Sequence, residues 1–599
     1  MSFDNVIVAV GGFGRYQRRI YLLLCIPPMF AAFHSMSGVF LAAQPSFRCL
    51  SPGENPENAT FDLPPNISAA TFPWDNDTES WSKCEMYDLD IQDQTEDVRP
   101  SLSPIGAPVV KCDSFLYDKS IFKNTITSEF NLICNRAWLR ALADSLLVVG
   151  MMAGAMVFGG LADRYGRKPI ICLCAVIQLT GALLASVAPE IFSFMIFRSI
   201  VTSTENGLLV ITVVSGENLL LLIYRSLEML VSEKRLLAGI GIQIFYSFGY
   251  ISVALFAYFI RDWRFLQAAL AVPSFGLLTY WWLIPESARW LFSNGRREEA
   301  KEILLKASSE NGIKLSHNHL DDILNEICTI DKPSESEKTS VVQLFKYPNL
   351  RRKTILLSIN WFVITSAYYG LSWNSGNLGG DLYLNFALVA LVELPGHMLP
   401  YFTMDRWGRK IMLCGCMFLA GVVLLLAQFV PSHMIWPNVL LTMLGKFAIT
   451  AAYDVIIIFA AEQYPTVLRN TGVGACATYA TIGAILAPYV NYSSVVWTSL
   501  PFVIYGTAAI IAGVLALRLP ETLNQILPDT IEDGERFGRS GSDVDVDEDN
   551  KKLKCTTKVL GFHRVGTETY LQSKSKEEPH YSGPNIKLPI NVEPIRTTS

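Results

Sequence analysis

Twelve stretches of about 20 predominantly apolar residues recur along the sequence, and they constrain its fold more than any other feature. About 20 helical residues, at 1.5 Å each, cross the roughly 30 Å hydrocarbon core of a bilayer. We therefore expect an all-α, polytopic membrane protein with twelve transmembrane helices. The expected spans are 21–43, 139–161, 169–189, 191–214, 236–260, 265–284, 354–374, 382–403, 411–430, 436–461, 471–490 and 497–518.

The composition supports the same class of protein. Of the 599 residues, 51% are hydrophobic and only 17% are charged, against about 25% charged residues in an average soluble domain. A soluble chain of this length would need several domains with polar surfaces, and it has too little charge to cover them. A net charge of −5 without a basic stripe also argues against nucleic acid as a partner.

Positive charge is concentrated in segments that would share one side of the membrane. The connections after the second and eighth expected helices are basic, whereas those near 375–381, 431–435 and 491–496 carry no Lys or Arg. The positive-inside rule then places both termini in the cytosol. Arg261 and Arg264 are exceptions, because they fall on the expected outer side.

This topology divides the chain into seven segments. They are a cytosolic N-terminus (1–20), the first helix (21–43), an extracellular loop (44–138), helices two to six (139–284), a cytosolic loop (285–353), helices seven to twelve (354–518) and a cytosolic tail (519–599). We expect the polar tail to be disordered.

The loop over 44–138 has the composition of a secreted domain. It contains Cys49, Cys84, Cys112 and Cys134, an even number that predicts two disulfides with three possible connectivities. Glycosylation acceptor sites start at Asn58, Asn66 and Asn76. A fourth site, at Asn491, is a weaker prediction because its outer loop is short. We expect a folded, disulfide-bonded, glycosylated ectodomain.

Three sequence patterns occur twice at nearly one spacing. Asp-Arg-x-Gly-Arg-Lys begins at residues 163 and 405, Glu-x6-Arg at 228 and 462, and Pro-Glu-Ser/Thr at 285 and 520, with offsets of 242, 234 and 235 residues. These patterns predict a parallel duplication of six helices each, which is the build of major facilitator transporters.

The repeated charges lie at the expected inner ends of the helices. There, Gly permits a tight turn, and acidic and basic side chains can pair with each other and with helix dipoles. We interpret them as a gating network, the alternative being that they only set the topology. Its members are Asp163, Arg164, Arg167, Glu228, Arg235, Glu286, Arg289, Asp405, Arg406, Arg409, Glu462 and Arg469.

Further motifs narrow the family. Gly-Phe-Gly-Arg-Tyr-Gln spans 12–17, Asn-Leu-Ile-Cys 131–134, Pro-Glu-Ser-Ala-Arg-Trp-Leu 285–291, Tyr-Tyr-Gly-Leu-Ser-Trp-Asn 368–374, and Ala-Glu-Gln-Tyr-Pro-Thr 461–466. Together they resemble the organic cation and carnitine transporter family over residues 10–525. The resemblance implies facilitated or coupled movement of small organic ions across a plasma membrane.

A charge inside a membrane is costly, so an ionisable residue at membrane depth suggests a functional site. Glu393 and Asp454 are the acidic candidates for substrate binding, the alternatives being a structural ion pair for Glu393 and an indirect pairing of Asp454 with Lys446. Arg198 and Lys446 could serve coupling or structure, and Glu205 and Asp144 are weaker candidates.

Aromatic rings can complete a cation site, because their faces attract ammonium groups. Trp361, Tyr368 and Tyr369 are the candidates, and the alternative is that they only pack helices together. The resemblance adds Gln243. It also marks Thr481, which stands where relatives often carry a charge that discriminates cations from anions, so the usual selectivity marker is absent.

The fourth expected helix departs from the repeat. Asp163 and Glu228 are 65 residues apart, whereas Asp405 and Glu462 are 57 apart. The extra residues fall near 215–225. They would shift this helix out of register or form a bulge at its inner end, or they reflect a gene-model artefact.

The sequence lacks the patterns of catalysis and of ATP-driven transport. Its histidines have no metal-ligand spacing, no Walker sequence occurs, and the glycines at 11–14 follow no strand. We therefore expect no cofactor and no enzyme activity. The leading hypothesis is transport of small organic cations by alternating access. The alternatives are ion-coupled uptake of carnitine-like zwitterions and a transporter-derived receptor or scaffold.

Overall fold

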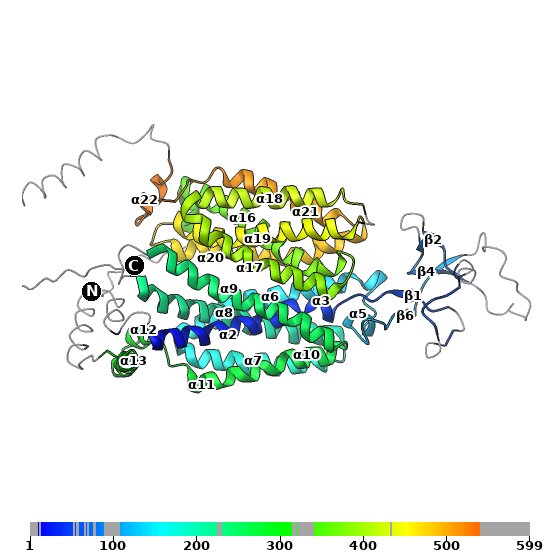
Figure 1. The fold of residues 1–599 in the computed structure, drawn as a ribbon, viewed down its shortest axis with the longest axis horizontal. Coiled ribbons are helices and arrows are strands. Elements are labelled where there is room, and N and C mark those ends of the chain that lie inside the picture. Colours follow the sequence, from blue (N-terminus) through cyan, green and yellow to red (C-terminus); the bar gives the residue numbers. More distant parts are fainter. Residues whose placement is uncertain are drawn as a thin grey trace, which may run out of the picture. The chain divides into compact units, whose positions relative to one another are not determined.

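Long helices dominate the protein (Figure 1). A computed structural model describes residues 10, 14–51, 54–55, 59–64, 68, 71–75, 80–88, 108–224, 231–313, 320, 341–431 and 434–539. The side chains of residues 210, 212–238, 240 and 377 are outside this description.

The first half contains six helical passages. They are α2 (Arg15–Met36) continued by α3 (Gly38–Leu41), α6 (Trp138–Tyr165), α7 (Arg167–Ser186), α8 (Ile191–Tyr224), α9 (Val231–Phe259), and the interrupted series α10 (Trp263–Ala271), η3 (Val272–Thr279) and α11 (Tyr280–Leu283). Asp262 caps α10, since its side chain accepts a hydrogen bond from the Arg264 backbone N–H at 2.9 Å. Pro273 lies at the start of η3, where its missing N–H interrupts the α-helical ladder.

The second half repeats this order. Its helices are α16 (Pro348–Trp373) followed by η4 (Asn374–Asn377), α17 (Leu382–Trp407), α18 (Arg409–Ala427), α19 (Ile435–Gln463), α20 (Arg469–Tyr492) followed by η5 (Ser493–Val495), and α21 (Leu500–Ala516). Each of the twelve expected spans overlaps one of these helices or the series α10–η3–α11. Figure 1 shows α16 to α21, in green to orange, beside α2 to α11, in blue to green.

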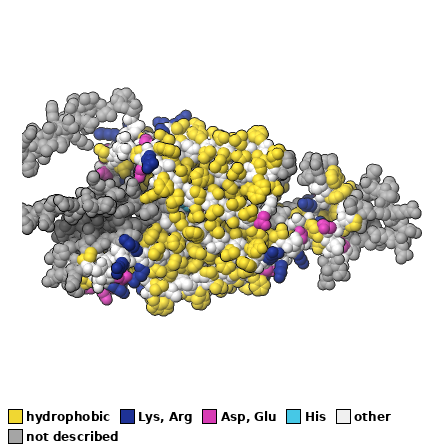
Figure 2. Space-filling model, viewed as in Figure 1, with side chains coloured by type: hydrophobic (Ala, Val, Ile, Leu, Met, Phe, Trp, Pro, Cys, Tyr) yellow, Lys and Arg dark blue, Asp and Glu magenta, His cyan; other side chains and the backbone are white. Residues whose placement is uncertain are grey.

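The lateral surface of the helices is apolar. Within the described residues, nine helices are long and apolar enough to cross a membrane, and α21 is a shorter apolar helix. Figure 2 shows hydrophobic side chains covering the helical part, with Lys, Arg, Asp and Glu gathered at its two ends. An apolar band of this kind is stable against lipid and not against water.

Helices from the two halves contact each other directly. The Ser145 hydroxyl on α6 donates a hydrogen bond to the Ile485 carbonyl on α20 at 2.8 Å. The Trp373 indole N–H, at the end of α16, donates to the Ser35 carbonyl on α2 at 3.3 Å. These contacts bring segments about 340 residues apart in sequence to one boundary.

The described part of the 44–138 segment contains three short antiparallel ribbons, followed by α5 (Ile126–Glu129) and η2 (Cys134–Arg136). The ribbons pair β1 (Phe47–Cys49) with β6 (Phe115–Tyr117), β2 (Trp74–Asp75) with β3 (Ser80–Trp81), and β4 (Glu85–Tyr87) with β5 (Val109–Lys111). The registers place Cys49 opposite Phe115 and Glu85 opposite Lys111.

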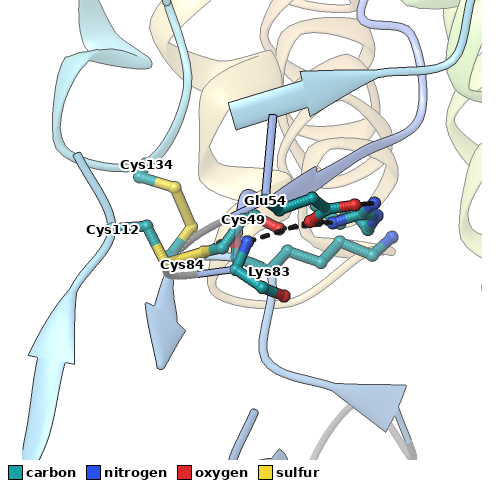
Figure 3. The surroundings of a disulfide bond; sticks show 8 residues. Cys49, Glu54, Lys83, Cys84, Cys112 and Cys134 are labelled. Carbon is teal, nitrogen blue, oxygen red and sulfur yellow. Dashed lines mark hydrogen bonds and ion pairs between the residues drawn. A yellow bond between two sulfur atoms is a disulfide. The ribbon is translucent and has the colours of Figure 1, made fainter. Parts of the chain in front are cut away.

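Two disulfides cross-link this segment. Cys49 bonds to Cys112 and Cys84 to Cys134, across sequence separations of 63 and 50 residues. Figure 3 shows the two bridges close together beside Glu54. The structure thus selects one of the three connectivities open from sequence. The predicted glycosylation sites Asn58, Asn66 and Asn76 lie outside the described residues.

Short helices occur in the segment that was expected to form a cytosolic loop. The 285–353 segment contains α12 (Ala288–Ser293), α13 (Arg297–Glu310) and α15 (Val341–Lys346). Glu310 at the end of α13 pairs with Arg19 of α2 at 3.0 Å.

The helices α2 and α16 begin at residues 15 and 348, earlier than the expected 21 and 354.

The expectation that disorder begins at residue 519 is wrong for the first part of the tail. A short helix, α22 (Ile531–Arg536), lies against the start of α16. The Glu535 carboxylate accepts hydrogen bonds from the backbone N–H groups of Asn349 and Leu350 at 3.0 and 3.1 Å. Because the free N–H groups of a helix start favour an anion, this contact fixes the segment. Residues 540–599 lie outside the described part.

The extra residues of the fourth passage continue a helix. α8 has 34 residues and extends to Tyr224, whereas its counterpart α19 has 29. Residues 225–230, which follow this extension, lie outside the described residues.

Candidate functional site

A buried ion pair lies deep in the second half. Lys446 on α19 places its Nζ 2.8 Å from Oε1 of Glu393 on α17, and both side chains are 0% exposed. The Lys446 ammonium also donates hydrogen bonds to the Ser372 hydroxyl at 2.6 Å and the Tyr368 carbonyl at 3.3 Å. Removing one member of such a pair leaves a buried, unpaired charge, at a cost of about 3–5 kcal/mol.

This ion pair touches the boundary between the halves. The Ser247 hydroxyl, on α9 of the first half, donates a hydrogen bond to Oε2 of Glu393 at 3.3 Å. Gln243 lies one turn earlier on α9, half-buried, and its carbonyl accepts the same hydroxyl at 3.1 Å. Tyr250, one turn later, donates to the Ser372 carbonyl at 3.4 Å. Glu393 is therefore held by both halves.

Aromatic rings surround the pair on the α16 side. The rings of Tyr368 and Tyr369 are 5.4 Å apart, and Tyr453 of α19 lies 5.4 Å from Tyr368 and 6.0 Å from Trp361. Lys446 places its ammonium 3.3 Å from the centre of the Tyr368 ring. The chain's own ammonium thus occupies an aromatic face beside a carboxylate, the arrangement that recognises organic cations.

Asp454 has a different partner from the one considered from sequence. Its Oδ2 lies 2.7 Å from Nδ1 of His397 on α17, and the two side chains are 8% and 3% exposed. Lys446 pairs instead with Glu393. The indirect pairing of Asp454 with Lys446 is therefore wrong, because residues eight apart on α19 lie more than two turns from each other.

Thr481 contributes no charge and is satisfied locally. Its hydroxyl donates a hydrogen bond to the Ala477 carbonyl one turn earlier on α20, at 3.0 Å. No described contact joins it to Glu393, Asp454 or the aromatic rings.

The first half carries a second set of ionisable groups. Arg198 and Glu205 of α8 are buried, and Arg198 donates a hydrogen bond to the His34 carbonyl on α2 at 3.2 Å. Asp144 of α6 and Glu205 both act electrostatically on Arg198. Asp144 and Glu205, the weaker candidates from the sequence, therefore lie in a separate charged group around Arg198.

The repeated Gly-Arg-Lys turns have the same geometry in both halves. Gly166 and Gly408 connect α6 to α7 and α17 to α18, with φ of 102° and 90°. Glu286 accepts hydrogen bonds from the Arg167 and Lys168 backbone N–H groups at 3.0 and 3.2 Å. Glu521 does the same for Arg409 and Lys410 at 2.9 and 3.1 Å. Each glutamate caps a helix start where the dipole favours negative charge.

Three charges of the second half form a network beside its turn. Arg409 lies 3.1 Å from Asp405 and 3.2 Å from Glu462. Thr522 donates a hydrogen bond to Glu462. Arg406 is exposed, and Arg469 contacts Thr466 at 3.4 Å.

The counterpart in the first half is only partly described. Asp163 and Glu286 act electrostatically on Arg167, while Arg164 and Arg289 are exposed. Glu228 and the side chain of Arg235 lie outside the described residues.

Sequence reasoning missed His397, Glu521 and Ser372 as parts of these sites. Two of these residues could have been recognised from the sequence. His397 follows Glu393 by four residues and shares its helix face, and Glu521 repeats Glu286 at the duplication offset. Ser372 could not have been. The residues that the structure describes contain no group of three or more His, Cys, Asp and Glu side chains suited to a metal ion.

Comparison with known proteins identifies the family that has this architecture. Residues 114–527 match the family described as sugar (and other) transporter. An organic cation transporter protein of Drosophila melanogaster is 44% identical over 544 residues, which cover 90% of this chain and 95% of the relative. Organic cation/carnitine transporter 2 of Mus musculus is 35% identical, with 89% and 93% covered.

The chain belongs to the organic cation/carnitine transporter family, within the major facilitator superfamily. This confirms the resemblance drawn from the motifs. The fold agrees: a partially occluded, inward-open structure of the xylose transporter XylE from E. coli superposes with a TM-score of 0.54 at 15% identity, covering 86% of this chain and all of that one. At this identity the likeness shows the fold alone.

Proposed function

We propose that this protein moves small organic cations across the plasma membrane by alternating access, with both termini in the cytosol. One observation carries the proposal: two carboxylates, Glu393 and Asp454, are buried at membrane depth beside a cluster of aromatic rings. Charges are kept at that depth only when they serve a function or a pairing. Relatives named as organic cation transporters support the same substrate class.

If the carrier is a uniporter for a monovalent cation, the membrane potential suffices as the driving force. A potential of 100 mV is worth about 2.3 kcal/mol per elementary charge, which corresponds to roughly 40- to 50-fold accumulation. A uniporter of this kind would need no second energy source.

The charged turns at the helix ends are the proposed gate. The ion pairs of Arg409 with Asp405 and Glu462 connect α17, α18 and α19 at one end of the second half. Breaking and reforming these pairs would let the helices separate and close around a fixed substrate site.

The test is uptake of labelled tetraethylammonium into proteoliposomes at two imposed membrane potentials. We expect Asp454→Asn and Glu393→Gln to reduce uptake at least tenfold. The matched control is Glu298→Gln, the same type of change on an exposed residue of α13. Unchanged uptake in both site variants would refute the assignment of the site.

Glu393→Gln also leaves Lys446 buried without its carboxylate, which can impair folding. The double variant Glu393→Gln/Lys446→Met removes both charges and separates the two effects. If it folds as wild type and still loses uptake, the charged pair acts on the substrate. If it regains full uptake, the pair is structural.

Lys446 favours a second candidate, ion-coupled uptake of carnitine-like zwitterions. Its ammonium is buried next to an acidic group, so one site offers a partner for both ends of a zwitterion. Sodium-dependent carnitine uptake that is lost in Lys446→Gln, with tetraethylammonium uptake retained, would support it. Saturable binding without any transport would instead favour a receptor.

A further inference from the structure

His397, the partner of Asp454, is a buried ionisable residue that the proposed transport mechanism does not use. Nδ1 of His397 lies 2.7 Å from the Asp454 carboxylate, and both side chains are more than nine-tenths buried. The other imidazole nitrogen, Nε2, is buried without a hydrogen-bond partner among the described residues. Buried polar nitrogens are ordinarily hydrogen-bonded, so one without a protein partner needs an explanation, and a role in binding a proton is one.

Helix packing fixes this geometry. α17 and α19 approach closely at Gly396, where a Cβ atom would lie 3.1 Å from the side chain of Thr450 and 3.4 Å from the Phe447 carbonyl. His397 follows directly, and Asp454 lies one turn after Thr450. The imidazole therefore meets the carboxylate without reaching into solvent.

Few other ionisable groups act on His397. Glu393, on its own helix, and Lys446, on α19, are the further charges that affect it. Away from the charged helix ends, the other titratable side chains described on α9, α16, α18 and α19 are hydroxyl and thiol groups. These are Tyr246 and Tyr250 of α9, Tyr368 and Tyr369 of α16, Tyr453 of α19, and Cys414 and Cys416 of α18.

The charge of the site then depends on one proton. Lys446 neutralises Glu393, so the four groups carry a net charge of minus one with a neutral imidazole and zero with an imidazolium. With Nδ1–H donated to Asp454, the free lone pair is on Nε2, and a proton binds there. Imidazole is the side chain whose charge ordinarily changes between pH 5 and 8.

We propose that the His397–Asp454 pair is a proton-binding site that exchanges with the organic cation, so that a proton and the substrate ammonium bind in competition. The inference rests on the proposed function, which supplies the cation. An imidazolium neutralises Asp454 and repels a second cation nearby, whereas the neutral pair attracts one. Because linkage is reciprocal, cation binding releases the proton.

The first experiment measures the KM for tetraethylammonium in proteoliposomes between pH 5.5 and 8.5, with the potential clamped by potassium and valinomycin. We expect KM to rise as pH falls, by up to about tenfold per unit where the pair is fully protonated. His397→Gln should transport with a KM that no longer depends on pH. His34→Gln changes another buried histidine, on α2, and should keep the dependence.

A second readout follows the proton itself. Pyranine trapped in the vesicles should report proton efflux when cation enters, and the purified protein should release protons on binding tetraethylammonium without any transport. A pH-independent wild-type KM, no proton release, or an unchanged pH dependence in His397→Gln would each overturn the inference.

Absence of uptake at every pH would instead refute the proposed transport. Proton release on binding would still support the exchange site in that case, and its absence would refute the site as well. Misfolding of His397→Gln leaves the wild-type measurements decisive.

Discussion

Gly166 and Gly408 join pairs of membrane helices through a backbone conformation that L-residues with side chains rarely adopt. Both have φ near +100°, and a Cβ atom would lie 2.5 Å from the Glu286 carboxylate at the first position and 2.6 Å from Glu521 at the second. The missing side chain thus permits the turn and leaves room for the carboxylate that caps the next helix.

We predict that Gly166→Ala and Gly408→Ala each destabilise the protein by about 1–3 kcal/mol, the usual cost of a strained backbone, with further loss from the displaced carboxylate. The measurement is the midpoint of thermal unfolding of the purified protein in detergent. Gly415→Ala is the matched control, because nothing lies within 4 Å of its Cβ position on α18. There, alanine should be neutral or stabilising. Equal midpoints in all three variants would contradict the argument.

The partners of the buried charges are also decided residue by residue. Lys446 and Asp454 are both on α19, yet Lys446 pairs with Glu393 and Asp454 with His397. Both partners are one turn apart on α17. Sequence identified the charged residues, but the rotation of α17 against α19 determined which of them meet.

At the scale of elements, Arg264 joins the 44–138 segment to the helices. It donates hydrogen bonds to Glu129 of α5 (Ile126–Glu129) and to the carbonyls of Ser186 and Ala188 at the end of α7, both at 2.9 Å. The indole N–H of Trp263 also donates to Glu129, at 2.6 Å. Arg264 breaks the expected charge pattern because it has a carboxylate partner and a helix C-terminus to bind.

Acid should weaken this junction. Burial alone would raise the pKa of Glu129, but hydrogen bonds from Arg264, Trp263 and Asn124 outweigh it and lower that pKa below its usual value. A lowered folded-state pKa contributes stability above the unfolded value of about 4.3, and this stability is lost as pH falls through the folded value. We predict that unfolding midpoints drop below about pH 4 in wild type.

Glu129→Gln tests this assignment. The variant should start with a lower unfolding midpoint at pH 7 and lose less of it on acidification than wild type. Tryptophan fluorescence reports the transition, since Trp263 is part of the junction. A parallel acid response in variant and wild type would assign the loss to another carboxylate.

The disulfides connect elements that are distant in sequence. We predict that non-reducing peptide mapping finds Cys49 linked to Cys112 and Cys84 linked to Cys134. Removing one bridge in Cys84→Ser/Cys134→Ser should cost about 2–5 kcal/mol, because a cross-link restricts the unfolded chain. Cys172→Ser, at a free thiol on α7, is the control. Peptides linking Cys49 to Cys84 would contradict the observed pairing.

At the scale of the whole molecule, the two halves share their turns but differ in their buried charges. Each half has a glycine turn capped by a glutamate. The second half holds the carboxylate, ammonium and imidazole groups beside the aromatic rings, whereas the first half centres its charges on Arg198. Among the described residues, the two halves therefore share the groups that shape the helix turns and differ in the charged groups buried between the helices.

The orientation across the membrane is tested by glycosylation. With 44–138 outside the cell, N-glycosidase should shift the full-length band, and Asn58→Gln, Asn66→Gln and Asn76→Gln should remove the shift stepwise. Asn491→Gln should leave it unchanged, because both ends of the Asn491 side chain are hydrogen-bonded, to Gly370 and Tyr505. A band that never shifts would refute the proposed topology or occupancy of these sites.

The sequence by itself determined the membrane class, the overlap of all twelve expected spans with helices, and the duplication. These follow from local hydrophobic length and from motifs whose residues are close together. It also identified Glu393 and Asp454 as candidates, because a charge at membrane depth is costly and therefore rare. The aromatic residues were candidates because their ring faces attract ammonium groups.

Only the tertiary structure decided the partners. These partners are at least 50 positions apart in the sequence. They include the two disulfides, the pairing of Asp454 with His397, the capping by Glu521 and the contacts of Arg264. Such contacts depend on how helices rotate and approach one another, as α17 and α19 do at Gly396. Local sequence carries no record of that rotation, so the chemistry of the site became visible only in the folded chain.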